Sequence, residues 1–276
     1  MNKKIIYGII TAIFLIGGIV GFNYYQKIFG KTITKDGVIY VGSNYHLMDV
    51  KKMLHDYTNN PQHFFFVAKK KKFTKPKGGK YTLKKGMTMN DVVNLLRSGN
   101  QTPIKIAFNN QDTLEKLAGR IAQQIEADST SLLNAMTDEA FLEKNGFNKK
   151  SALGMYIPNS YEFYWNTSAE KFRNKMLREY KRFWNSTRLE KAKNLNLSKD
   201  QVTTLASIVQ KETAQKSERP IVAGLYLNRL KDNWPLQADP TIIYCIKQIK
   251  GQDFSVKRVL TKDLEIKSPY NTYKNV

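Results

Sequence analysis

The sequence contains little cysteine and little histidine. Its single cysteine, Cys245, excludes an intramolecular disulfide, and its apolar surroundings predict a small buried side chain and not a nucleophile. Cys245 also lies far from the N-terminus, which excludes a lipoprotein anchor there. The three histidines, His46, His55 and His63, lack the spacing of a metal-ligand motif, so we expect no metal site.

Acidic residues are scarce as well. The chain has 23 acidic residues against 45 lysines and arginines, for a net charge of +22. A positive charge of this size favours an anionic neighbour. Nucleic acid would suit a cytosolic protein, whereas anionic lipid headgroups or the carboxylate-rich cell wall suit an exported one. For most individual lysines, the simpler interpretation is a solvated surface with no specific ligand.

One long apolar run is present near the N-terminus. Ile5–Phe22 carries no charge, and as a helix it would span about 27 Å at about 1.5 Å per residue, close to the roughly 30 Å of a bilayer core. Lys3 and Lys4 favour a cytoplasmic N-terminus, although further lysines follow the run. We therefore expect a single-pass anchor over residues 1–25 in the cytoplasmic (inner) membrane, with the rest of the chain on its outer face.

A cleaved signal peptide and a buried core helix are the alternatives for this run. No small-x-small cleavage site follows it, which favours an uncleaved anchor. The core helix of a soluble domain would rarely be so uniformly apolar. About 250 residues remain after the run, enough for two domains.

Residues 26–102 are predicted to form a small mixed module. Its clearest part is a strand over Lys80–Leu83, followed by a helix that Thr88 caps and Gly99 ends. This strand–turn–helix unit resembles a LysM module, a small fold that binds wall glycan. Two further short elements are expected upstream: a helix over Ser43–Tyr57 and a strand over His63–Ala68.

Residues 103–276 are predicted to form a larger, helix-rich domain with short strands, which makes the fold class α+β. Leu114, Leu117, Ala118 and Ile121 lie at helical spacing and predict a helix with one buried face. The other expected elements are a linking strand over Pro103–Phe108, a helix over Thr130–Lys144, a Tyr-rich loop and strand over Met155–Trp165, and a long basic helix over Ser168–Leu195.

Glu212 is the most informative residue of this domain. A helix opens at the capping box Ser198-x-x-Gln201, and Glu212 continues its apolar face. Partial burial would raise the pKa of this carboxyl and let it hold a proton near neutral pH, as a general acid requires. The structural alternative is a glutamate near a helix end that is bonded to Arg219 or Arg229. The expected buried face comprises Val202, Leu205, Ala206 and Val209.

Polar and aromatic side chains follow Glu212 closely in the sequence. A second helix, ending near Lys231, carries Asn228, and the loop after it carries Gln237 and Asp239, although Asp239 could simply cap the next segment. The last segment, Ser268–Tyr273, combines aromatic rings with amides. Such groups suit sugars, because rings stack on C–H faces and amides bond to hydroxyls.

Four motifs in this region carry a family resemblance. In order, Leu205–Thr213 reads LASIVQKET, Val222–Leu230 reads VAGLYLNRL, Leu236–Tyr244 reads LQADPTIIY and Ser268–Tyr273 reads SPYNTY. Together they resemble the MltG (YceG-like) endolytic murein transglycosylases, in which a single-pass anchor and a LysM-like unit also occur.

The resemblance implies lysis of the bond between N-acetylmuramic acid and N-acetylglucosamine without water. The muramyl C6 hydroxyl attacks C1 and leaves a 1,6-anhydromuramyl end, so one glutamate, Glu212, protonates the departing oxygen and then takes the C6 hydroxyl proton. This chemistry needs no metal and no cofactor. The implied substrate-binding residues are Asn228, Gln237, Asp239, Tyr270 and Asn271.

The chain departs from the family pattern in three places. Asn159 stands where the family often has aspartate in a Pro-Asp-Thr-Tyr motif, and Gln210 stands where it commonly has a second glutamate. Family members also usually continue well beyond the Asn-Thr-Tyr motif, whereas this chain stops at Val276. A fragment with an incomplete site is therefore one expectation that the pattern leaves open.

Two other classes of function stay open. One is a non-catalytic peptidoglycan-binding protein with a degenerate enzyme domain. The other is a membrane-anchored scaffold of the cell-wall synthesis machinery, in which the basic helix Ser168–Leu195 is an interaction face. The expected partners are peptidoglycan glycan strands, the membrane and cell-wall synthases, and no nucleic acid.

Overall fold

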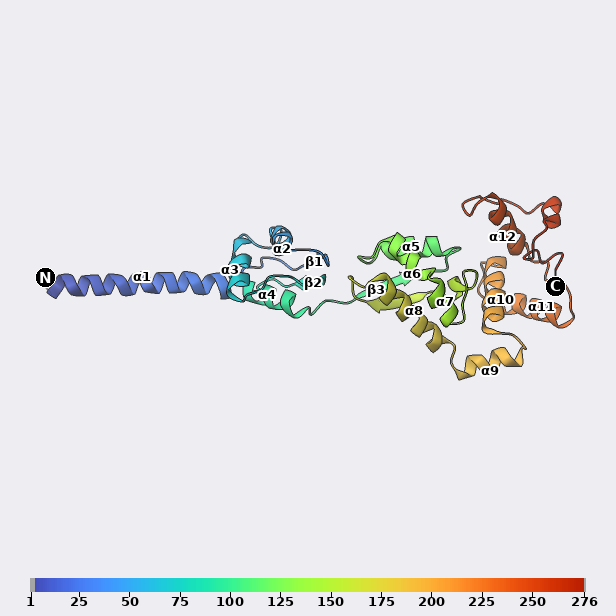
Figure 1. Cartoon of the computed structure of the whole chain (residues 1–276), viewed down its shortest axis with the longest axis horizontal. Coiled ribbons are helices and arrows are strands. Elements are labelled where there is room, and N and C mark those ends of the chain that lie inside the picture. Colours follow the sequence, from blue (N-terminus) through green and yellow to red (C-terminus); the bar gives the residue numbers. More distant parts are fainter. Residues whose placement is uncertain (1–2, 276) are drawn as a thin grey trace. The chain divides into compact units, whose positions relative to one another are not determined.

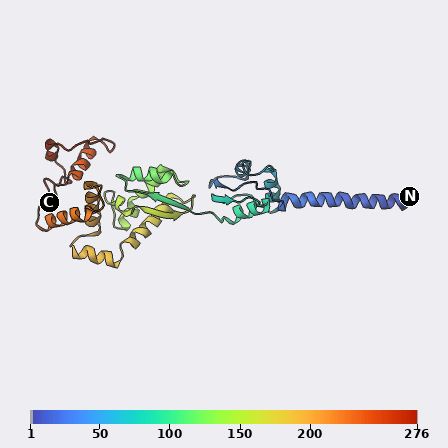
Figure 2. The same ribbon diagram turned by 180° about the vertical axis from the view of Figure 1, so that it is seen from behind.

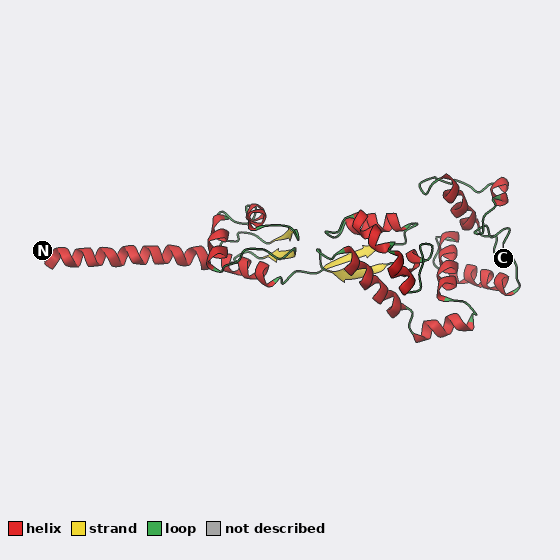
Figure 3. Ribbon diagram, viewed as in Figure 1, coloured by secondary structure: helices red, strands yellow, loops and turns green. Residues whose placement is uncertain are grey.

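The computed structural model describes residues 3–275 and divides into two compact units, Met1–Arg178 and Glu179–Val276. Helices dominate both units, and the strands are short (Figures 1 and 3). The predicted α+β class is confirmed. Met1 and Asn2, at the predicted cytoplasmic N-terminus, and Val276 lie outside the described residues.

Helix α1, Lys3–Phe29, contains the predicted apolar run and extends beyond it. Its described apolar side chains are exposed along most of its length, and it is long and apolar enough to cross a membrane. Near its end the Tyr24 ring meets Phe66 edge-on at 5.2 Å, and the Lys70 ammonium lies 5.4 Å from the Tyr24 ring centre. Figure 2 shows the same end of α1 against the following helices from behind.

A small module follows α1, and its two strands pair directly. Strand β1, Gly37–Val41, runs antiparallel to β2, Gly79–Leu83, and Val41 faces Gly79 in the register. Tyr81, Phe64 and Leu54 are among the fully buried side chains of its core, each worth about 1.5–3 kcal/mol of burial. The helices of this module are α2, Leu47–Leu54; α3, Gln62–Lys70; and α4, Met89–Ser98.

The predicted boundaries of α4 are confirmed. Thr88 caps the helix in a reciprocal capping box with Asp91, which satisfies two otherwise unpaired backbone N–H groups. Gly99 ends it in the left-handed conformation at φ 74°, which a residue without Cβ adopts freely.

The predicted strand over His63–Ala68 is wrong, because this segment belongs to α3. Phe64, Val67 and Ala68 are buried at the i, i+3, i+4 spacing of a helix face, and they pack into the module core. Aromatic residues favour strands only where a pleated surface receives them. The predicted helix over Ser43–Tyr57 is shorter in the structure, where α2 covers Leu47–Leu54.

The remainder of the first unit is built on a second antiparallel pair. Strand β3, Ile104–Phe108, pairs with β4, Asn159–Phe163, so the predicted linking strand is instead half of a ribbon. Helix α5, Leu114–Ala122, buries the predicted apolar stripe. The other elements are α6, Ser129–Met136; α7, Glu139–Lys144; the short 3-10 helix η1, Ala152–Met155; and α8, Ala169–Phe183.

The single helix predicted over Thr130–Lys144 is wrong, because Asp138 divides it. The Asp138 carboxylate accepts the backbone N–H of Phe141 at 3.1 Å and so starts α7. It also pairs with Arg173 at 3.0 Å, and the hydrogen bond from Phe141, followed by that of Arg173, holds the pKa of Asp138 below its usual range. The same Arg173 guanidinium donates to the carbonyl of Ala135 at 3.0 Å and lies 3.6 Å from the Phe141 ring centre.

The long helix predicted over Ser168–Leu195 is also wrong, because it breaks after Phe183. Asn185 accepts the N–H of Arg188 at 3.0 Å and caps a new helix, α9, Ser186–Asn194. Asparagine competes with helix continuation because its short side chain bonds to nearby backbone groups.

The second unit continues with α10, Lys199–Glu212; α11, Arg219–Lys231; α12, Asp239–Lys250; and the short 3-10 helix η2, Thr261–Glu265. Its core cluster joins Val209 of α10 and Tyr226 of α11 to Leu236 and Ala238 of the following loop. The capping box at Ser198 and the burial of Cys245 are confirmed.

The predicted buried face of α10 is only partly correct. Val209 is buried, Val202 and Leu205 are half-buried, and Ala206 is exposed. The apolar spacing identified the helix but not the depth of its burial, which depends on how much of α10 its neighbours cover.

We expect Arg173→Met to lower the free energy of unfolding by about 1–3 kcal/mol, because the buried Ala135 carbonyl and Asp138 would lose their donor. Thermal unfolding followed by circular dichroism measures the change. Arg182→Met is the matched control, since Arg182 is largely exposed and pairs with Glu179 on the surface at 2.9 Å. Equal losses in the two variants would contradict a special role for Arg173.

Candidate active site

Glu212 is the last residue of α10, and its side chain is exposed. The predicted half-burial of this carboxylate is therefore wrong. A carboxylate at the C-terminal end of a helix faces the negative end of the helix dipole, which makes the position unfavourable without a partner. Neighbouring side chains must therefore stabilise the Glu212 carboxylate at this helix end.

The neighbour that bonds to Glu212 is Tyr226 of α11. The Tyr226 side chain is 3% exposed, and its hydroxyl shares a hydrogen bond with the Glu212 carboxylate. Burial, and then the charge of Glu212, raises the pKa of Tyr226 above its usual range. The hydroxyl thus stays protonated and donates to Glu212 throughout the neutral pH range.

In the described part of the chain, no hydrogen bond or ion pair joins Glu212 directly to Arg219 or Arg229, the two arginines of the structural alternative. Arg229 donates to the backbone carbonyl of Leu236, and Arg219 has a buried Nε without a hydrogen-bond partner among the described residues. The positive charge of Arg229 nevertheless acts on Tyr226. It lowers the pKa of Tyr226, but burial raises this pKa by a larger amount.

A second carboxylate–tyrosine pair lies beside the first. The Tyr273 hydroxyl donates to Oδ1 of Asp239 at 2.7 Å. Burial, the hydrogen bond and the charge of Asp239, and then the charge of Glu212 raise the pKa of Tyr273 to about 12. Because the charges of both carboxylates act on Tyr273, the structure brings Glu212 and Asp239 into one cluster.

The C-terminal turn is fastened to the loop before α12. The backbone N–H of Gln237 donates to the carbonyl of Thr272 at 2.8 Å, and that of Ala238 donates to the Thr272 hydroxyl at 3.0 Å. The hydroxyls of Thr241 and Thr272 lie 2.9 Å apart. These bonds hold Tyr273 next to Asp239 and leave the side chain of Gln237 exposed.

Asn271 is placed differently from the sequence expectation of a sugar ligand. It is 0% exposed, and its Nδ2 donates to the carbonyls of Leu264 at 2.9 Å and Ile266 at 2.8 Å. Its Oδ1 accepts the N–H of Tyr273 at 2.9 Å. Through these bonds Asn271 positions the C-terminal turn, and the predicted sugar contact stays a prediction.

The remaining predicted residues lie on the surface of the same unit. Asn228 is exposed on α11, and Asp239 is the first residue of α12, where Ala238 and not Asp239 is the capping residue. Tyr270 is exposed and meets Tyr244 of α12 edge-on, with ring centres 5.1 Å apart. Within residues 3–275, no group of three metal-ligating side chains is placed to hold an ion.

Residues 39–276 match the model of the YceG-like family. The chain belongs to this family.

Proteins named endolytic murein transglycosylase are among the relatives of this YceG-like chain. The one from Bacillus subtilis (strain 168) is 31% identical over 236 residues, which cover 80% of this chain and 64% of the relative. The one from Streptococcus pneumoniae serotype 2 (strain D39) is 29% identical over 240 residues, which cover 77% of this chain and 43% of the relative. The chain thus spans less than two thirds of the length of the first relative and less than half of the second.

A solved structure shares the fold. The crystal structure of a putative YceG-like protein from Listeria monocytogenes aligns with a TM-score of 0.55 at 27% identity. The alignment covers 87% of this chain and 83% of that one.

Three tyrosines of the candidate site, Tyr226, Tyr244 and Tyr273, were not predicted from the sequence. Each lies within one of the four motifs, but no role was assigned to it. The available signal was their place inside the four motifs, because a tyrosine in an otherwise aliphatic helix face brings a hydroxyl that must find a partner when buried.

We expect Asn271→Ala to loosen the C-terminal turn of this YceG-like chain, because two carbonyls and one N–H would lose their partner. The expected loss of stability is about 1–3 kcal/mol. Hydrogen–deuterium exchange of residues 264–275 should rise, while exchange in α5 stays unchanged. Unaltered exchange around Tyr273 would contradict the positioning role.

Proposed function

We propose that this chain is a lytic transglycosylase of peptidoglycan that leaves 1,6-anhydroMurNAc ends, with Glu212 as its catalytic acid and base. The observation that carries the proposal is the hydrogen bond between the exposed Glu212 carboxylate and the buried Tyr226 hydroxyl, beside the Asp239–Tyr273 pair. The names of the relatives, endolytic murein transglycosylase, support the same reaction.

In the proposed reaction, protonated Glu212 gives its proton to the oxygen of the glycosidic bond as that bond breaks. The muramyl C6 hydroxyl forms the new bond to C1, and its proton passes to the Glu212 carboxylate. The glutamate thereby returns to its starting state, and the products are an anhydromuramyl end and a free hydroxyl on the departing sugar. No water enters, so a second ionised group to activate water is unnecessary.

The exposure of Glu212 fits a site that the substrate itself covers. A general acid must lie within about 3 Å of the oxygen that it protonates, so its carboxyl has to be reachable by the glycan. Sugar rings laid over Glu212 would displace water and favour its protonated form. Tyr226 would hold the carboxylate in one orientation while this happens.

The neighbouring polar groups are proposed to hold the glycan. Asp239, Gln237 and Asn228 would bond to sugar hydroxyls and acetamido groups, because amides and carboxylates together offer both donors and acceptors. Tyr270, paired with Tyr244, offers an exposed aromatic edge and face for sugar C–H groups.

The N-terminal parts are proposed to keep this reaction at the membrane. Helix α1 would anchor the chain in the cytoplasmic membrane with its N-terminus inside and both units on the outer face. The module over residues 26–102 would act as a LysM-like binder of wall glycan. Cell-wall synthases are proposed as partners, since they produce the glycan strands that such an enzyme would cleave.

We expect Glu212→Gln to abolish anhydro-ended products from purified wall glycan, measured by mass spectrometry with the full chain in detergent. Glutamine keeps the shape and accepts the Tyr226 hydroxyl but cannot transfer a proton. Glu190→Gln, which alters an exposed carboxylate on α9 of the same unit, should keep full activity. Glycan binding by the wild-type chain with no new ends would favour a non-catalytic binder, and neither binding nor new ends would favour a scaffold.

We expect Tyr226→Phe to lower kcat about 10-fold with little change in KM, because it removes the bond that orients Glu212 and leaves the glycan contacts intact. The loss corresponds to about 1.4 kcal/mol of transition-state stabilisation. Tyr180→Phe, a buried tyrosine of the same unit outside the cluster, is the control. A rise in KM alone would show that Tyr226 serves binding and not the orientation of the acid.

A further inference from the structure

We propose that a groove along α8 is a second binding site, and that it takes a carboxylate-bearing peptide of the kind attached to wall glycan. The choice of this ligand rests on the proposed function. The groove lies in the first unit and uses none of the residues around Glu212.

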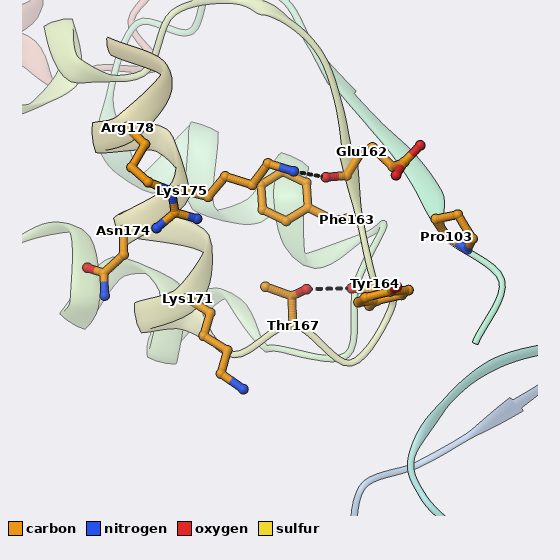
Figure 4. A pocket seen from close by; sticks show the side chains of 9 residues that line it. All are labelled: Pro103, Glu162, Phe163, Tyr164, Thr167, Lys171, Asn174, Lys175 and Arg178. Carbon is orange, nitrogen blue, oxygen red and sulfur yellow. Dashed lines mark hydrogen bonds between the residues drawn. The ribbon is translucent and has the colours of Figure 1, made fainter. Parts of the chain in front are cut away.

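The groove is a cavity of about 340 Å³, within the range of small-ligand sites. One wall is the polar face of α8, from which Lys171, Asn174, Lys175 and Arg178 project (Figure 4). The opposite wall is the end of β4 and the loop that follows it, and Pro103 lies at the rim.

The charge of this groove is positive and largely uncompensated. Its lining residues include three cations, Lys171, Lys175 and Arg178, and one acidic residue, Glu162. The Glu162 carboxylate points away from α8 in Figure 4. The two acidic residues of α8 itself are engaged elsewhere: Glu170 bonds to Ser168, and Glu179 pairs with Arg182 at 2.9 Å. Three like charges along one helix face repel one another unless an anion lies between them.

The central cation of the groove is already held in place. The Lys175 ammonium lies 4.5 Å from the centre of the Phe163 ring and donates to the carbonyl of Glu162. An ammonium has three N–H donors, so two remain for a ligand. The loop opposite is fixed as well, because the Thr167 hydroxyl donates to the Tyr164 carbonyl at 2.6 Å.

The rest of the lining selects a peptide over a bare anion or a neutral glycan. Tyr164 is 53% exposed at the groove, and together with Pro103 it offers apolar surface for side-chain carbons. Asn174 offers a donor and an acceptor for a peptide group. The forked guanidinium of Arg178 matches a carboxylate in two parallel bonds. A neutral glycan would bring no negative charge to these three cations.

The test compares binding of soluble wall fragments with and without their peptides to the full chain in neutral nanodiscs. All variants carry Glu212→Gln, so that the probe stays intact, and fluorescence anisotropy gives the Kd at fixed salt. We expect Lys171→Gln with Arg178→Gln to raise the Kd for the peptide-bearing fragment about tenfold. The matched control, Lys144→Gln with Lys150→Gln, removes the same charge from exposed residues of the same unit outside the groove and should stay within about twofold.

Equal losses in both pairs would overturn the proposal in favour of long-range charge, and equal affinity for fragments without peptides would overturn peptide recognition. Displacement by polyphosphate at lower concentration than by the free peptide would assign the groove to a phosphate polymer instead. Anhydro ends are scored in parallel with Glu212 intact. If anhydro ends form but the groove substitutions do not change binding, only this inference is overturned. If the groove substitutions weaken binding but no anhydro ends form, only the proposed reaction is overturned.

Discussion

The hydrogen bond between Glu212 and Tyr226 is the constraint on which the candidate site depends. It ties the last residue of α10 to a buried side chain of α11, at a helix end where a carboxylate is otherwise unfavourable. Since Tyr226 also belongs to the small core cluster with Val209, Leu236 and Ala238, the packing of the unit and the orientation of its acid are set by the same residue. The Glu212 carboxylate is exposed to solvent, while the buried Tyr226 hydroxyl fixes its orientation.

The polar residues of the C-terminal turn divide into two groups by burial. The side chains of Asn271 and Thr272 form hydrogen bonds with backbone groups and with Thr241, and these bonds hold the turn against the start of α12. The hydroxyl of Tyr273, in the same turn, donates a hydrogen bond to Asp239. Tyr270 of the turn remains at the surface, as does Gln237 of the loop before α12, where a glycan can reach both side chains. A compact polar motif in sequence therefore contains both the support of the site and its proposed contacts.

The tertiary structure also gathers some of the positively charged side chains in one place. Most lysines of the described residues are exposed, whereas Lys171, Lys175 and Arg178 line one cavity and Lys70 lies over an aromatic ring at the end of α1. The net charge alone favours anionic surroundings, and the groove along α8 adds a shape that one anionic group could occupy.

Local signals in the sequence determined the apolar helix at the N-terminus, the α+β class, the capping of α4 and α10, and the family through its four motifs, because each depends on residues close together in the chain. They could not determine the break at Asp138, the helix over His63–Ala68 or the exposure of Glu212. The break at Asp138 combines a local capping bond to Phe141 with the distant Arg173, and the other two depend on the core of the small module and on how far α11 covers α10. Tyr226 became a partner of Glu212 only when α11 folded back against α10, and burial of its hydroxyl then required an acceptor.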